Sequence, residues 1–153
     1  MSAFTKDNLK FIFADSLLEI IKKMTGFPLD ILSYEDDSNF DEITGVMNLN
    51  GKNHGLLLIS ADENTIRIIC SFMTGIKKEE ITKNDIEDTL CELVNMTAGS
   101  AKLRLSKLDF VFNLTSPFLF KGQNMHITGN NRVHIVSVVL GNEEIKIKIK
   151  IVY

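Results

Sequence analysis

The sequence predicts an α/β (α+β) domain over residues 1–153, in which two long helices pack on one largely antiparallel six-stranded sheet. Its length suits one domain with one core. Two segments, 5–24 and 84–106, have the apolar periodicity of amphipathic helices. Each is followed by three short segments with strand-like alternation. The order of elements therefore occurs twice, as two pseudo-symmetric repeats at about 5–60 and 84–152.

In the first repeat, the helix at 5–24 is expected to end at Gly26 and Pro28, since neither residue favours helix continuation. Asn50 and Gly51 form a dipeptide that strongly favours a tight hairpin turn. The three strands of this repeat are expected at 29–36, 43–49 and 54–60.

A connecting helix is expected at about 61–75, where Ser60 and Glu63 have the spacing of a capping box. The second long helix follows. Gly141 and Asn142 favour the last hairpin turn. The three strands of the second repeat are expected near 109–115, 132–140 and 144–152.

The second long helix has a polar face. At about 100° per residue, this face gathers five polar or small residues, namely Asp88, Glu92, Asn95, Gly99 and Lys102. Glu92 and Asn95 are three residues apart and are therefore surface neighbours. Gly99 costs a helix about 1 kcal/mol relative to alanine. Either a partner docks flush against it, or the small residues around it let the helix lie close to a sheet.

The full pattern is Asp88-x3-Glu92-x2-Asn95, then Met-Thr-Ala-Gly-Ser-Ala-Lys, with Pro117 after 21 intervening residues. It closely resembles the CheC/CheX/FliY family of chemotaxis phosphatases, whose members carry an Asp/Ser-x3-Glu-x2-Asn helix motif and a downstream proline. The single intact motif and the chain length are most similar to the CheX branch. The resemblance implies a CheC-like fold, with Pro117 shaping a strand end or loop near the site.

The resemblance also implies a function: hydrolysis of the aspartyl phosphate on a CheY-type response-regulator receiver domain. An acyl phosphate has a good leaving group, and Mg²⁺ bound by the receiver supports the phosphoryl oxygens, so positioning of a water is the main task left. The implied roles are water positioning for Asn95 and pairing with the receiver's lysine for Glu92. No cofactor is expected on this chain.

The remaining residues of the polar face, Asp88, Gly99 and Lys102, are expected to contact the partner. Each also has a simpler explanation: Asp88 as an acid that favours the helix N-terminus, Lys102 as an ordinary exposed lysine, and Gly99 as noted above. The intact Glu92 and Asn95 pair favours an enzyme over a non-catalytic receiver-binding or flagellar-switch adaptor module. A small-molecule sensor domain is disfavoured, because the sequence has no glycine-rich phosphate loop.

The two long helices also match in sequence. The segment from Asp15 to Lys22 aligns with the segment from Asp88 to Asn95 at a constant offset of 73 residues. Lysine at position 22 replaces the asparagine, and an ammonium group cannot accept a hydrogen bond. The first helix is therefore expected to be a site that has lost its activity.

Composition excludes several classes. The net charge of −3 argues against nucleic-acid binding. No apolar run is long enough for a membrane helix and no secretory signal is apparent, so a cytoplasmic protein is expected. The histidines are scattered, so no metal site is expected. Cys70 and Cys91 are expected to be free thiols.

A homodimer through sheet edges is expected from the resemblance. The strand with Ile145 and Ile151 is a candidate edge, although its lysines also resemble an edge that resists pairing.

Overall fold

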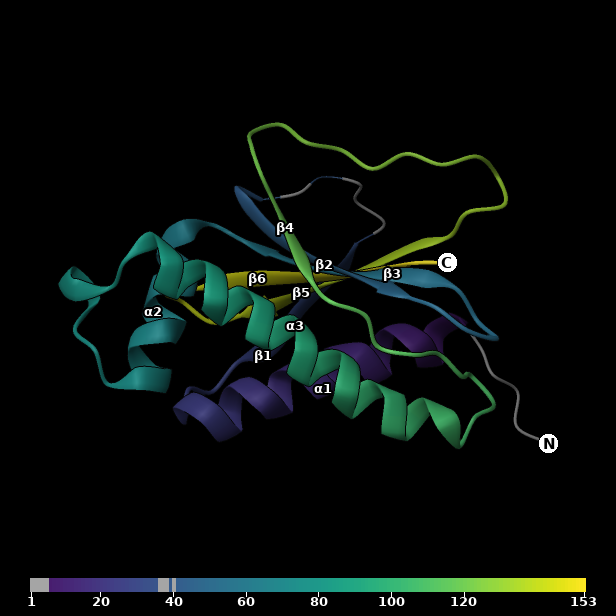
Figure 1. The fold of residues 1–153 in the computed structure, drawn as a ribbon, viewed down its shortest axis with the longest axis horizontal. Coiled ribbons are helices and arrows are strands. Elements are labelled where there is room, and N and C mark those ends of the chain that lie inside the picture. The colour runs from purple at the N-terminus through teal and green to yellow at the C-terminus, as the bar shows by residue number, and fades with distance from the viewer. Residues whose placement is uncertain (1–5, 36–38, 40) are drawn as a thin grey trace.

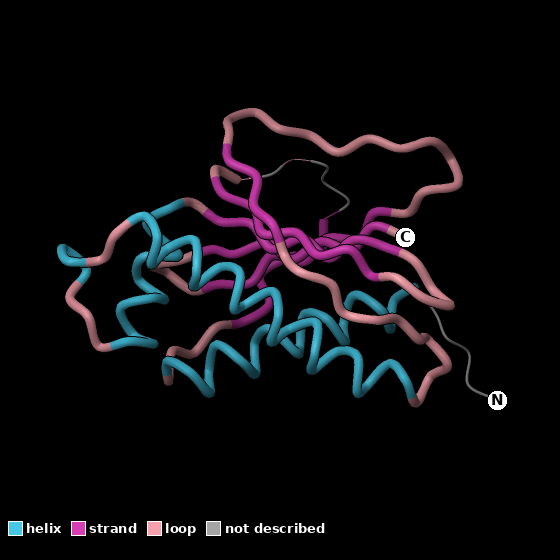
Figure 2. Tube along the Cα trace, in the orientation of Figure 1, coloured by secondary structure: helices cyan, strands magenta, loops and turns pink. Residues whose placement is uncertain are grey.

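The computed structural model describes residues 6–35, 39 and 41–153. Its helices lie against one face of a single sheet (Figures 1 and 2). The helices are α1 (Lys6–Thr25), α2 (Glu63–Thr74) and α3 (Lys83–Ser106), with a short 3-10 turn, η1 (Lys78–Glu80). The strands are β1 (Asp30–Glu35), β2 (Ile43–Leu49), β3 (Gly55–Ala61), β4 (Phe118–Lys121), β5 (Ile135–Gly141) and β6 (Lys146–Val152).

The six strands form one antiparallel sheet in the order β1-β5-β6-β3-β2-β4. Exchanging β1 with β4, β2 with β5 and β3 with β6 reverses this order and leaves it otherwise unchanged. The two repeats meet at the centre, where Leu57 of β3 faces Ile151 of β6 and Ile59 faces Ile149. The α/β class, the antiparallel six-stranded sheet and its pseudo-symmetry are therefore confirmed.

The two long helices run in opposite directions across the sheet (Figure 1), and their inner faces correspond at the 73-residue offset. Leu17 of α1 and Leu90 of α3 are both fully buried. The hydroxyls of Ser16 and Thr89 each donate to the carbonyl four residues earlier, at an O···O distance of 2.7 Å in both cases. This bond satisfies a buried hydroxyl without a partner from another element.

The middle of α3 lies directly on β2 at Gly45. A Cβ atom at this position would stand 2.8 Å from Cγ2 of Val94 and 3.1 Å from Cγ of Leu90. The helix therefore packs against bare backbone at this point, and no side chain on β2 separates the two elements. Glycine is required here by the close approach and not by its backbone angles.

The N-terminal cap of the connecting helix α2 differs from the predicted one. The prediction of a capping box formed by Ser60 and Glu63 is wrong. Ser60 lies in β3, and its hydroxyl accepts a backbone N–H from a neighbouring loop. The N-cap of α2 is Asp62, whose carboxylate accepts the backbone N–H three residues on. A complete capping box instead begins α3, between Thr82 and Asp85. That box fixes where the helix with the polar face begins.

The prediction of a strand at 109–115 is wrong. Phe110 and Phe112 are buried and alternate with exposed residues, as in a strand. The backbone of Asn113, however, pairs with Asn50 directly after β2 as an isolated bridge only, and 109–115 forms no continuous strand. The fourth strand, β4, begins directly after Pro117. Proline lacks the N–H that a continuing ladder would need.

The expectation that the last strand forms a sheet edge is also wrong. β6 lies inside the sheet between β5 and β3, and the edges are β1 and β4. Its isoleucines, together with Ile145 directly before it, are buried in the core with the helices. Lys150 on its other face is only 1% exposed. The alternation of isoleucine and lysine here belongs to an inner strand, whose lysines pass from exposed at Lys146 to buried at Lys150.

Candidate functional site

The structure brings the five predicted site residues together on the outer side of α3. We call this surface the polar stripe; it comprises Asp88, Glu92, Asn95, Gly99 and Lys102. Asp88 and Glu92 are exposed, and the other three are half-buried. The opposite side of the helix lies in the core, where its residues are fully or nearly fully buried. One helix therefore presents all five groups on one surface.

The two central groups of the stripe are free of internal partners. Within residues 6–35, 39 and 41–153, no hydrogen bond or ion pair involves the Glu92 carboxylate or the Asn95 amide. Their three-residue separation on a regular helix holds the side chains as neighbours. A carboxylate and an amide held in this way can accept and donate hydrogen bonds to another molecule without breaking any contact within the fold.

Cys91 lies between the stripe and the sheet edge. Burial raises the pKa of its thiol, and the nearby carboxylates of Asp88 and Glu87 raise it further. Glu87 forms an ion pair with Lys121 of β4, which ties the helix to the edge strand. The raised pKa disfavours the thiolate, which is the form in which a cysteine acts as a nucleophile. Cys70 and Cys91 are both free cysteines.

Gly99 does not serve close packing inside the chain. Beyond the helix's own backbone, a Cβ atom at Gly99 would meet no heavy atom of the described chain within 4 Å. The residues that touch the core are its neighbours Ala98 and Ala101, which are fully buried. Close packing against the sheet is therefore the wrong explanation for Gly99, and the open space lies on the outer surface of the stripe.

Sequence reasoning missed one prominent residue next to the stripe. Leu103 follows Gly99 by four residues, so it lies one turn further along the same side of α3. Its exposed fraction is 73%. The helical rotation of 100° per residue that places the five stripe residues on one side also places Leu103 beside them, but its apolar side chain is not part of a polar pattern.

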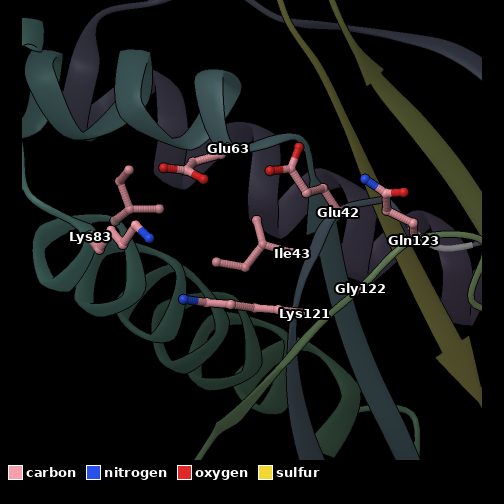
Figure 3. A pocket seen from close by; sticks show the side chains of 8 residues that line it. Glu42, Ile43, Glu63, Lys83, Lys121, Gly122 and Gln123 are labelled. Carbon is pink, nitrogen blue, oxygen red and sulfur yellow. The ribbon is translucent and has the colours of Figure 1, made fainter.

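A charged cleft of about 240 Å³ lies near the N-terminal end of α3 (Figure 3). The side chains of Lys83 and Lys121 extend into it, with the carboxylates of Glu42 and Glu63 across from them. Two positive and two negative groups leave no net charge to select an anion or a cation. The sequence did not indicate this cleft, because its residues come from separate elements.

The corresponding face of α1 has a different environment. Asp15, Glu19 and Lys22 are exposed along it, as their alignment with α3 predicts. Glu19 forms an ion pair with Arg104, which comes from the last turn of α3. Glu92, its aligned counterpart, has no such partner among the described residues. The first repeat therefore holds its carboxylate in an internal contact.

Two further findings concern metals and membranes. Among the described residues, no three or more histidine, cysteine, aspartate or glutamate side chains gather in an arrangement that could hold a metal ion. In the same part of the chain, no helix has both the length and the apolar character needed to span a membrane.

Several solved structures share this fold. A CheC-like superfamily protein from Shewanella sp. PV-4 has a TM-score of 0.84 and 26% identity, over 97% of this chain and 98% of that chain. The chemotaxis protein CheX from Vibrio vulnificus has a TM-score of 0.82 and 22% identity, over 94% and 97%. A CheX-CheY-BeF3-Mg²⁺ complex from Borrelia burgdorferi contains a chain with a TM-score of 0.78 and 21% identity, over 94% and 96%. No curated protein matches the sequence.

The sequence model of one family, described as chemotaxis phosphatase CheX, matches residues 43–140. The matched segment is more than half of the chain and includes the whole of α3 with its polar stripe. The fold of the solved relatives agrees with this match. The chain belongs to the CheX family of chemotaxis phosphatases.

Proposed function

We propose that this protein accelerates hydrolysis of the aspartyl phosphate on a CheY-type receiver domain, with the polar stripe of α3 as its active surface. The observation that carries the proposal is the pair of Glu92 and Asn95, which are three residues apart and free of internal partners in the described chain. Family membership supports it. A related structure contains CheX together with CheY, BeF3 and Mg²⁺.

Asn95 is proposed to position the attacking water. Its amide oxygen accepts a hydrogen bond from the water and its nitrogen remains free to donate. The residue is half-buried, so the helix surface limits the directions that its side chain can take. An acyl phosphate needs a water held in line with the leaving oxygen more than it needs a strong base. A neutral amide therefore suffices, and the step requires no covalent intermediate on this chain.

Glu92 is proposed to pair with the receiver's active-site lysine and so to fix the helix over the phosphorylation site. Asp88, Gly99 and Lys102 are proposed to contact the receiver along the same stripe. The Mg²⁺ that supports the phosphoryl oxygens is expected on the receiver, and no cofactor is assigned to this chain. Action on a receiver domain would take place in the cytoplasm.

The test follows phosphate release from a phosphorylated receiver with wild-type protein and with Asn95→Ala. Wild type should accelerate release, and Asn95→Ala should lose most of the acceleration while its melting temperature stays the same. If the wild type bound the receiver without accelerating phosphate release, the proposed phosphatase activity would be contradicted. That result would assign the stripe to a receiver-binding or flagellar-switch adaptor module.

We also propose that two copies associate through the β4 edge of the sheet. Phe118 and Phe120 on this edge strand are 44% and 51% exposed, with ring centroids 5.4 Å apart. They line an apolar groove of about 420 Å³ together with β2 and β3. An edge strand with apolar side chains is suited to pairing with a second copy. Phe120→Lys should reduce the molar mass measured by light scattering to that of one chain, and an unchanged mass would contradict this interface.

A further inference from the structure

The exposed side chain of Leu103 stands beside the proposed active surface. At 73% it is the most exposed large hydrophobic residue of the described chain. Its neighbours Ala101 and Leu105 are fully buried, so the helix is correctly seated on the core at this level. The exposure of Leu103 is therefore not the result of a rotated or displaced helix. It projects from the same side of α3 as Gly99 and Glu92.

Hydrogen bonds at the end of α3 hold the backbone around Leu103 in place. The hydroxyl of Ser106 donates to the carbonyl of Leu103 at 2.9 Å, and the backbone N–H of Phe110 donates to the carbonyl of Leu105 at 3.1 Å. These bonds satisfy carbonyls that a helix end leaves without partners. The last turn is thus part of the same helix as the polar stripe, and the backbone of Leu103 keeps its place relative to Asn95.

Leu103 and Gly99 together form a step on the helix surface. The space over Gly99 is open, and one turn further the leucine side chain stands out from the helix. A partner surface that approaches closely at the glycine would meet the leucine next. Glu92 and Leu103 are eleven residues apart, which is about 16 Å along a helix. An ordinary interface of about 800 Å² per partner spans roughly 30 Å and would cover both.

We propose that Leu103 anchors the receiver domain, by packing against an apolar area of the receiver surface next to its phosphorylation site. This inference rests on the proposed function, since it assigns the same partner to an adjoining surface. The receiver is the occupant because Leu103 continues the surface that carries Glu92 and Asn95. Leu103 lies too far from Asn95 to touch the reacting atoms. It acts on affinity and not on the chemical step.

The test uses Leu103→Ala and a phosphorylated receiver, and measures the dissociation constant and the dephosphorylation rate at saturating protein separately. The dissociation constant should rise about tenfold, which corresponds to about 1.4 kcal/mol, while the saturated rate stays that of the wild type. Leu103→Met should retain the affinity, because it keeps a flexible apolar side chain of similar volume. Leu103→Asp should bind more weakly than Leu103→Ala.

The matched control is Leu32→Ala, which removes a leucine that is 45% exposed on the edge strand β1. It should leave the receiver affinity unchanged. An unchanged dissociation constant for Leu103→Ala, with Asn95→Ala still inactive, overturns the anchor and leaves the proposed function intact. A wild type that binds the receiver without accelerating hydrolysis overturns the proposed function, and the affinity of Leu103→Ala still decides the anchor. A Leu103 variant that changes only the oligomeric state assigns this residue to a contact between copies and overturns the proposal.

Discussion

α1 and α3 share an inner face and differ in their outer faces. Inside, the hydroxyls of Ser16 and Thr89 make the same bond at the same aligned position. Outside, position 22 is lysine and its counterpart at 95 is asparagine. The inner faces of the two helices are constrained by one shared core. The outer faces lie outside that core, so their residues can differ in chemistry.

The same residue type ends one helix and continues the other. Gly26 and Gly99 are 73 residues apart, like the other aligned pairs. Gly26 has a positive φ of 70° and follows the last residue of α1, whereas α3 continues seven residues beyond Gly99 to Ser106. These added turns carry Leu103 and Arg104. The helix with the intact motif is thus also the helix that extends beyond the glycine.

If the two inner faces are equivalent, truncating either should have a similar and large effect. Leu17→Ala and Leu90→Ala should each lower the free energy of unfolding by about 2–5 kcal/mol, because both side chains are fully buried. Denaturant unfolding of the two variants measures this. A loss confined to one variant would show that the halves do not share one cooperative core.

The outer faces should differ in activity. Asn95→Ala should lower receiver dephosphorylation roughly 100-fold, the scale of a lost positioning contact. Lys22→Ala should leave the rate within experimental scatter, because a lysine cannot take over the accepting role of the amide. Both rates are measured on the same phosphorylated receiver. Equal losses at the two positions would instead show that α1 also engages the partner.

The two aligned glycines should respond to alanine with opposite signs. Gly26→Ala should lower the free energy of unfolding by about 1–2 kcal/mol, since alanine resists the left-handed conformation. Gly99→Ala should raise it by up to about 1 kcal/mol, since alanine is the better helix former and has open space there. Thermal melts of both variants measure the contrast. If the stripe contacts the receiver, Gly99→Leu should weaken receiver binding while the protein stays folded.

The smallest effect on stability is expected at the ion pair that joins α1 to the last turn of α3. The side chains of Arg104 and Glu19 are 37% and 61% exposed, so water and salt screen their attraction. Arg104→Ala should therefore cost at most about 1 kcal/mol of stability. Its dephosphorylation rate should match that of the wild type. A large loss of activity would place Arg104 in the receiver interface and contradict its assignment to the first repeat.

The sequence predicted the helices and most strands because their apolar periodicity is strong and local. It failed for 109–115, where Phe110 and Phe112 alternate as in a strand. Alternation reports which side chains are buried, and it does not report where the backbone hydrogen bonds go. The neighbours of β6 in the sheet were likewise not predictable, since an edge strand and an inner strand can have the same isoleucine and lysine pattern.

The candidate site was accessible to sequence analysis because one helix carries it, and the spacing within a helix fixes which residues are neighbours. The pair of Arg104 and Glu19 was not accessible, because it joins residues 85 positions apart through the packing of two helices. The charged cleft near Lys83 was hidden for the same reason. The space over Gly99 also needed the structure, since the sequence allowed both an open and a packed glycine.

Gly45 determines the height of α3 above the sheet, because it leaves the helix in contact with bare strand backbone. An added methyl group there would meet Val94 and Leu90 from beneath. The helix would have to rise or pivot at that point, and a pivot displaces the ends of a long rod more than its middle. The distance between the sheet and the outer surface of α3 is therefore encoded at a position that the surface itself does not contain. A substitution at position 45 would therefore change how far the outer surface of α3 stands from the sheet, without changing any residue on that surface.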